Sequence, residues 1–244
     1  MHKNKGLPKV AENAEKHLPS PQVKICGLTN VHEAVTCARL GADAIGFVFY
    51  PKSPRAVTAH QAKAISMALP SSICRVGVFV DETFDTILQT VRMARLQAVQ
   101  LHGMESPAIV EELNSRGLTV IKALFSHREP LFTHAMRYPA ASFLVECGVG
   151  PLPGGNARAW DFSLLKDFAK DFALVLAGGL TTDNVTQAID LCQPDALDIS
   201  SGIECAPGKK DLEKVKRFIS AVQKVPSAKP NRRIFYVNDG PNAS

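Results

Sequence analysis

The chain has 244 residues, of which 45% are hydrophobic, so it is long enough to bury one large core within a single domain. Its formal net charge is +5. Residues 1–22 carry four Lys against two Glu, and residues 225–244 carry three Lys or Arg against one Asp, so the two ends account for +4 of this excess. Because the remaining body is close to neutral, we expect no nucleic-acid partner.

The six cysteines are widely spaced, with no C-x-x-C pair and no histidine at zinc-finger spacing. Residues 1–22 are basic and polar, without the apolar centre of a signal peptide, and no apolar run approaches the length of a membrane span. We therefore expect a cytoplasmic protein with free thiols, no membrane partner and no metal or organic cofactor.

Apolar, β-rich runs alternate with helical patterns between two predicted tails, residues 1–22 and 225–244. The runs are continuously apolar, as in parallel strands that are covered on both faces. The strand candidates are residues 23–26, 44–49, 75–80, 98–101, 119–124, 142–145, 173–176 and 196–199.

Each strand candidate is followed by a stretch in which apolar residues recur at three- and four-residue spacing, such as Val31, Val35 and Ala38. Eight such units in about 200 residues predict one α/β domain, a (β/α)8 TIM barrel, over residues 23–224. A doubly wound open sheet is the alternative. No G-x-G-x-x-G motif follows the first strand, where a dinucleotide-binding fold would carry it, so the barrel is favoured.

Barrel enzymes carry their chemistry on residues that follow the strands. Cys26, followed by Gly27, would act as a base or nucleophile if its pKa were depressed, and would otherwise be an inert buried thiol. Arg55 follows stiffening prolines and offers a planar fork for a carboxylate, unless it is only a solvated loop residue. His102 either lines the mouth of the barrel or caps a strand.

Glu146 follows the sixth strand candidate and precedes a long Gly- and Pro-rich segment. Loops of that length are usually functional or disordered. A carboxyl group in a water-poor mouth beneath such a loop can serve as a general acid, whereas an exposed one would be an ordinary loop residue.

Glycines follow the seventh and eighth strand candidates. Gly178 and Gly179 lead into a helix near residues 181–184, and Ser201 and Gly202 follow the eighth strand. Glycines let backbone N–H groups approach an anion, a helix N-terminus favours negative charge, and barrels commonly bind phosphate at these two loops. The two loops together predict a phosphate site, with plain turn glycines as the alternative.

With these residues side by side, the chain resembles the phosphoribosylanthranilate isomerase family over residues 23–224. The resemblance implies an Amadori rearrangement of a small phosphorylated substrate in tryptophan biosynthesis, without a cofactor. The matching motifs are VKICGLT at 23–29, GFVF at 46–49 with PKSPR at 51–55, VGVFV at 76–80, VQLHG at 99–103, LAGGL at 176–180 with NV at 184–185, and DISSGIE at 198–204 with PGKKD at 207–211.

Position by position, the resemblance implies that Cys26 is the general base and Glu146 the general acid. Arg55 would bind the anthranilate carboxylate, and His102 and Asp198 are further candidates for contacts with the substrate. The phosphate would be held by Gly178, Gly179, Ser201 and Gly202.

Two features depart from the family pattern. The usual acid is Asp, whereas Glu146 is one methylene longer. The loop that usually reads Gly-Gly-Thr-Gly before an aromatic-Asp-Trp segment reads GGNARAWDF here, at residues 154–162. Both changes bear on rate and specificity, because misplacing a catalytic group by about 1 Å can cost about a hundredfold in rate.

Two other functions compete with this interpretation. A barrel synthase that closes the indole ring would favour a lysine acid and paired glutamates, but Lys24 is expected to point away from the lumen if Cys26 points into it. A non-catalytic paralogue that binds a phosphorylated ligand would explain the altered acid and loop. For the assembly, a monomer is expected in preference to a homodimer.

Overall fold

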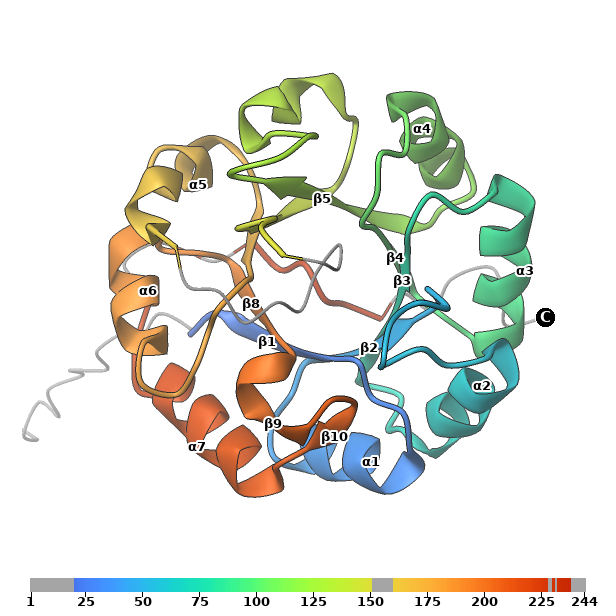
Figure 1. Cartoon of the computed structure of the whole chain (residues 1–244), viewed down its shortest axis with the longest axis horizontal. Helices are drawn as coiled ribbons and strands as arrows, with labels where there is room; N and C mark the ends of the chain where they lie inside the picture. The colour runs from blue at the N-terminus through green and yellow to red at the C-terminus, as the bar shows by residue number, and fades with distance from the viewer. Residues whose placement is uncertain (1–19, 151–159, 228–229, 231, 238–244) are drawn as a thin grey trace, which may run out of the picture.

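The computed structural model describes residues 20–150, 160–227, 230 and 232–237. Its main strands are β1 (Gln22–Cys26), β2 (Ala44–Val48), β3 (Cys74–Phe79), β4 (Ala98–Leu101), β5 (Thr119–Phe125), β6 (Ser142–Glu146), β7 (Leu174–Leu176) and β8 (Ala196–Ile199). Each pairs in parallel with its neighbours in sequence, and β8 returns to β1, so the sheet closes into a barrel (Figure 1). Each of these eight strands begins and ends within one residue of its prediction, and the predicted (β/α)8 barrel is confirmed.

Helices surround the barrel on its outside (Figure 1). The α-helices are α1 (Val31–Arg39), α2 (Ala59–Ala68), α3 (Phe84–Ala94), α4 (Pro107–Ser115), α5 (Phe168–Asp171), α6 (Val185–Cys192) and α7 (Leu212–Gln223). Shorter elements are the 3-10 helices η1 (Phe132–Arg137), η2 (Phe162–Leu165) and η3 (Ser201–Ile203), and a hairpin of β9 (Glu204–Ala206) and β10 (Lys209–Lys210). Within the described ranges, no helix has both the length and the apolar character needed to span a bilayer.

The unit after β5 departs from the prediction of a helical stretch behind every strand, because it forms only the 3-10 helix η1. Pro130 and Pro139 flank this segment. Proline has no N–H to donate, and it forces the residue before it out of the helical region. Tyr138 accordingly has an extended backbone, with φ −113° and ψ 123°.

Local capping interactions determine where several helices begin. Asn30 accepts a hydrogen bond from the N–H of Glu33 in α1, and Thr58 and Gln61 form a reciprocal capping box at α2. These interactions set the helix starts and thereby the lengths of the loops that reach the mouth of the barrel.

Two apolar cores lie on the two sides of the barrel wall. The larger one fills the space between the strands and the helices. The smaller one fills the lumen, mostly with small residues: Ala44, Cys74, Val76, Ala98, Ile121, Ala123, Phe125, Leu144, Val175, Ala177 and Ala196, joined by Ile234 and Phe235 from the C-terminal segment.

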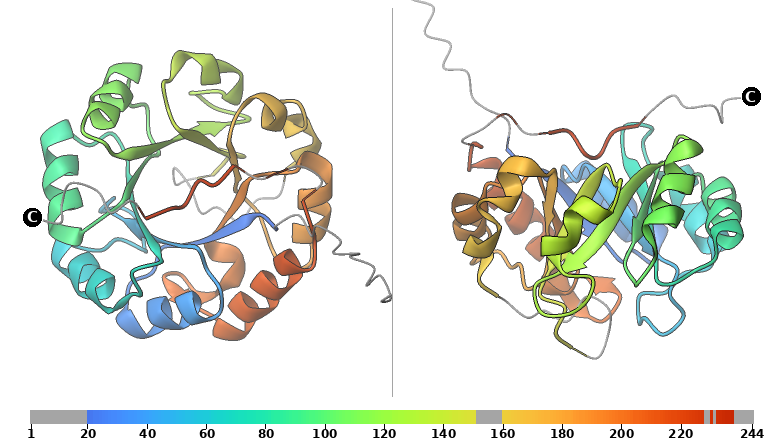
Figure 2. Two further views of the ribbon diagram at one scale, coloured as in Figure 1. Left: turned by 180° about the vertical axis from the view of Figure 1, so that it is seen from behind. Right: turned by 90° about the horizontal axis from the view of Figure 1, so that it is seen from above.

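The C-terminal segment, residues 232–236, lies across the end of the barrel where the strands begin (Figure 2). Gln22 Nε2 donates to Phe235 O at 2.7 Å, and Gln22 Oε1 accepts from the N–H groups of Ile234 and Phe235 at 2.8 and 2.9 Å. The Arg232 N–H donates to Asp195 Oδ1 at 2.9 Å. This part of the predicted C-terminal tail therefore closes the floor of the lumen, and the open mouth lies at the opposite end.

Candidate active site

Strand β1 directs two reactive side chains into the lumen. Cys26 and Lys24 are two residues apart, so they share one face of the extended strand. A Cβ built on Gly46 of β2 would lie 2.9 Å from Cys26 Sγ and 3.0 Å from Lys24 Cε, so both side chains lie over this glycine. The expectation that Lys24 points away from the lumen is wrong, because side chains alternate along a strand and the intervening Ile25 is the one that faces the helices.

Lys24 is fully buried and has two strong partners. Its Nζ donates to Asp198 Oδ1 at 2.8 Å and to Gln100 Oε1 at 2.9 Å. Burial alone would lower the pKa of this ammonium group, but the Asp198 carboxylate favours the charged form and the pKa is raised above its ordinary value. Lys24 is therefore a cation, and it lies beside the thiol.

The Cys26 side chain is buried, and burial raises the pKa of its thiol. Lys24 and Lys210 lower this pKa and Asp198 raises it, but the charges do not reverse the effect of burial. The structure therefore lacks the depressed pKa that a resting thiolate would need. The free protein keeps Cys26 as a neutral thiol, with two cations nearby that would stabilise the thiolate once the proton leaves.

Glu146 ends β6 and is buried, with 6% of its surface exposed. Its Oε1 lies 3.2 Å from Nε2 of His102, whose Nδ1 lies 2.9 Å from Nε2 of Gln100. Gln100 also accepts a hydrogen bond from Lys24, which lies beside Cys26. A continuous series of polar contacts therefore connects Glu146 with this lysine. The predicted acid and the predicted base thus belong to one end of the lumen.

Arg55 forms a bidentate ion pair with Glu204, with Nε–Oε1 at 2.8 Å and Nη2–Oε2 at 2.7 Å. Lys210 Nζ donates to the same Oε1 at 2.8 Å. Burial would raise the pKa of the Glu204 carboxyl, but Arg55 and Lys210 leave it lowered. Arg55 Nη1 makes no hydrogen bond within the described ranges, so one edge of the guanidinium group remains for a ligand. A Cβ on Gly27 would lie 2.5 Å from Arg55 Cδ, which places Arg55 next to the turn that follows Cys26.

The loop after β7 carries two predicted phosphate-binding residues in the left-handed region that favours glycine. Gly178 has φ +83° and Gly179 has φ +69°. Asn184, just before α6, donates from Nδ2 to Gly179 O at 2.8 Å and so holds the loop in place. A Cβ on Gly178 would lie 3.0 Å from Glu146 Cβ, so this loop lies against the predicted acid.

The loop after β8 packs directly on the loop after β7. A Cβ on Gly202 would lie 2.0 Å from Leu180 O, a distance that excludes any larger residue. Ser201, beside it, begins η3, and the preceding Ser200 donates from Oγ to Cys26 O at 3.0 Å. The four predicted phosphate-binding residues therefore come from two adjoining loops, one touching Glu146 and the other touching Cys26.

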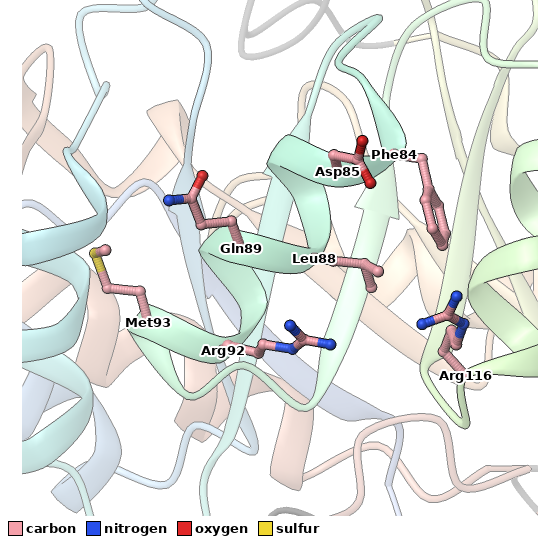
Figure 3. A pocket seen from close by; sticks show the side chains of 7 residues that line it. All are labelled: Phe84, Asp85, Leu88, Gln89, Arg92, Met93 and Arg116. Carbon is pink, nitrogen blue, oxygen red and sulfur yellow. The ribbon is translucent and has the colours of Figure 1, made fainter.

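A separate hollow lies on the outer surface along α3 (Figure 3). There the Arg116 guanidinium lies over the ring of Phe84, 5.6 Å from its centroid. This hollow contains none of the side chains that the sequence predicts for the site. Among the residues that the structure describes, no three or more His, Cys, Asp or Glu side chains are grouped so that they could hold a metal ion.

A family model described as N-(5'phosphoribosyl)anthranilate (PRA) isomerase matches residues 23–221. The chain belongs to this family. The N-(5'-phosphoribosyl)anthranilate isomerase of Desulfatibacillum aliphaticivorans is 46% identical over 214 residues, which cover 88% of this chain and 98% of the relative. The phosphoribosylanthranilate isomerase of Thermotoga maritima has a crystal structure that is 40% identical, with a TM-score of 0.78 over 84% of this chain and 100% of the other.

A second crystal structure of a phosphoribosylanthranilate isomerase contains reduced 1-(o-carboxyphenylamino)-1-deoxyribulose 5-phosphate, and it matches this chain with a TM-score of 0.76 at 40% identity over 84% of this chain and 100% of the other. These findings confirm the predicted family, the barrel and phosphoribosylanthranilate isomerase activity in tryptophan biosynthesis. Residues 151–159, which include most of the altered loop, and residues 1–19 of the predicted N-terminal tail lie outside the described residues.

Four side chains at the site received no role from the sequence. Lys24 and Gln100 each lie two residues before a predicted site residue, so the two-residue period of a strand could have identified them. Glu204 and Lys210 follow β8, in the hairpin of β9 and β10. Glu204 pairs with both Arg55 and Lys210 only in the folded chain. No spacing in the sequence predicts that contact.

Proposed function

We propose that this isomerase uses Glu146 as its general acid and Cys26 as its general base on N-(5'-phosphoribosyl)anthranilate. Protonated Glu146 gives its proton to the ring oxygen of the ribose, the C1–O bond breaks, and the nitrogen lone pair forms a C=N bond. Cys26, as the thiolate, removes the proton from C2, and the electrons of that bond form C1=C2 while nitrogen regains its lone pair. The resulting enolamine gains a proton at C1 and loses the C2 hydroxyl proton, which gives the 1-deoxyribulose product.

The observation that carries this proposal is the buried series of contacts that joins Glu146 through His102 and Gln100 to Lys24, next to Cys26. It supports an acid and a base that act on one substrate from one end of the lumen. Proton transfer by positioned groups of this kind contributes typically 10²–10⁴-fold in rate.

The remaining predicted site residues would fix the substrate at its two ends. We propose that the phosphate binds at Gly178, Gly179, Ser201 and Gly202, where two glycine-bearing loops adjoin. Arg55 would receive the anthranilate carboxylate on its open edge, next to the ion pair with Glu204. Asp198 would act through Lys24, whose charge it balances.

Steady-state kinetics of Cys26→Ser and Glu146→Gln test the two catalytic roles. Each substitution should lower kcat by about a thousandfold or more, while binding of a reduced product analogue changes less than about threefold, because the phosphate loops stay intact. Cys205→Ser, at an exposed thiol, is the matched control and should leave kcat unchanged. Near-parental turnover in Glu146→Gln would show that the acid is another group.

Complementation of a tryptophan auxotroph that lacks the isomerase tests the whole function in one step. Growth supports catalysis by the unaltered chain, with Glu146 in the acid position. Failure to grow, with the protein present and folded, would favour the non-catalytic paralogue that binds a phosphorylated ligand.

We propose that the enzyme is a cytoplasmic monomer whose only partner is its small phosphorylated substrate, without nucleic acid or membrane. Its exposed large hydrophobic residues are scattered over several elements, and part of the C-terminal segment covers the floor of the barrel. The T. maritima isomerase, by contrast, is dimeric. Light scattering after size exclusion should give a mass near 26.3 kDa, and a mass twice as large would overturn the monomer.

A further inference from the structure

We infer that His102 is a positioning residue that holds Glu146 through its Nε2–H, and that a buried relay starting at Lys24 selects this tautomer. The role in catalysis rests on the proposed function of Glu146, whereas the tautomer follows from the hydrogen-bond geometry alone. The relay runs from Lys24 through Gln100 and His102 to Glu146.

The relay has a fixed direction because its first member can only donate. A lysine ammonium group has three N–H donors and no acceptor. Since Lys24 Nζ lies 2.9 Å from the Gln100 side chain, the atom that faces it must be the amide oxygen. Asp198, at 2.8 Å from the same Nζ, keeps the lysine charged and in place.

The orientation of Gln100 determines the tautomer of His102. With its oxygen bound to Lys24, the Gln100 amide presents its NH2 group to His102 Nδ1, at 2.9 Å. Nδ1 must then accept, so the proton of a neutral imidazole lies on Nε2. Nε2 faces Glu146 Oε1 at 3.2 Å and donates to it.

The imidazole ring is also fixed by packing. The Phe125 ring meets it nearly at right angles, with centroids 5.6 Å apart and an interplanar angle of 84°. Both ring nitrogens of His102 are occupied by protein groups, which leaves neither for the substrate. The prediction that His102 contacts the substrate is thereby replaced by an assignment to Glu146.

Holding Oε1 of Glu146 gives the carboxyl group one defined orientation. Within the described ranges, the side chain makes no second hydrogen bond, so Oε2 remains for the proton that goes to the ring oxygen. The extra methylene of Glu adds a rotatable bond, and the His102 contact removes this freedom. The same relay holds Lys24 beside Cys26, so the acid and the base are oriented by one set of buried side chains.

Imidazole ¹⁵N NMR of the unaltered protein tests the tautomer without any use of activity. The His102 resonances, assigned by their loss in His102→Gln, should show an unprotonated Nδ1 and a protonated Nε2. Gln100→Glu should reverse this pattern, because the introduced carboxylate still accepts from Lys24 but can no longer donate to Nδ1. A proton on Nδ1 in the unaltered protein would overturn the relay.

A pair of substitutions tests the positioning role. In His102→Gln the side-chain amide nitrogen can take the place of Nε2 and still donate to Glu146, whereas the shorter side chain in His102→Asn reaches only toward Gln100. We expect His102→Asn to lower kcat by about a hundredfold with KM changed less than about threefold, and His102→Gln to stay within about tenfold of the parent.

Equal losses in the two variants, with both folded by circular dichroism, would overturn the positioning role, and so would a loss confined to KM. Separate measurements test the catalytic role of Glu146 and the tautomer of His102. An unaltered chain without isomerase activity would contradict the proposed function, while the NMR measurement would still decide the tautomer.

Discussion

The reactivity of Cys26 depends on the balance between burial and charge. Burial raises the pKa of the thiol, and the Lys24 and Lys210 cations offset only part of that rise. The thiolate is therefore a minor form in the free protein, although two ammonium groups are in place to stabilise it. This arrangement suits a base that must take a proton from carbon and then give it up again.

Replacement of Glu146 by the acid that is usual in the family tests how strictly this residue is positioned. Glu146→Asp withdraws the carboxyl group by about 1.5 Å, one C–C bond, which breaks the 3.2 Å contact with His102. We expect kcat to fall by about ten- to a hundredfold in steady-state assays, with Glu213→Asp on the surface of α7 as the neutral control. An equal or higher kcat in Glu146→Asp would mean that the surrounding structure is built for the shorter side chain.

Motifs and strand ends in the sequence identified single residues of the site. Contacts between side chains far apart in the chain could not be predicted from them. Cys26, Glu146 and the glycine loops all lie at the mouth, as predicted. The predicted orientation of Lys24 was wrong. Lys24 and Cys26 are two residues apart in an extended strand, so their side chains lie on the same face. The pairing of Arg55 with Glu204 joins side chains 149 positions apart, and only the folded chain reveals it.

At the level of elements, the contact between the loops after β7 and β8 is the tightest in the proposed phosphate site. A Cβ on Gly202 would meet Leu180 O at 2.0 Å, so Gly202→Ala must push the loops apart. We expect KM to rise by about tenfold, equivalent to about 1.4 kcal/mol, and inorganic phosphate to inhibit less strongly.

Gly117→Ala is the matched control, because a Cβ at Gly117 has open space around it although its φ is +75°. It should lower the free energy of unfolding by about 1 kcal/mol and leave KM unchanged. An unchanged KM in Gly202→Ala as well would remove this loop from the phosphate site.

Strands were predicted more accurately than helices, for a physical reason. A strand buried on both faces is a short continuous apolar run, and such runs are bounded clearly in this sequence. The turn of 3-10 helix that replaces an α-helix after β5 depends on prolines at both ends of one segment. Periodicity detects the apolar face of that segment but not the limit on its length.

At the level of the whole molecule, the C-terminal segment adds a floor to the barrel. The family model ends at residue 221, before this segment. Its Phe235 is 2% exposed and packs with the lumen core. This packing could not be predicted from the sequence, because two apolar residues among prolines and charged residues carry no periodicity.

Phe235→Ala measures what this floor contributes. We expect a loss of about 3 kcal/mol in the free energy of unfolding from denaturant titration, with kcat unchanged because the segment lies at the end of the barrel away from Cys26 and Glu146. Arg233→Ala, at an exposed neighbour, should change stability by less than about 0.5 kcal/mol. Equal stability in the two variants would show that the segment does not close the floor in solution.

A crystal structure of this chain with the reduced product analogue is the most direct measurement of how the site works. We expect the phosphate between residues 178–179 and 201–202, with Cys26 Sγ within reach of C2 and Glu146 Oε2 facing the oxygen that is released from the ring. A ligand bound elsewhere, or held with C2 turned away from Cys26 or the ring oxygen turned away from Glu146, would contradict the account.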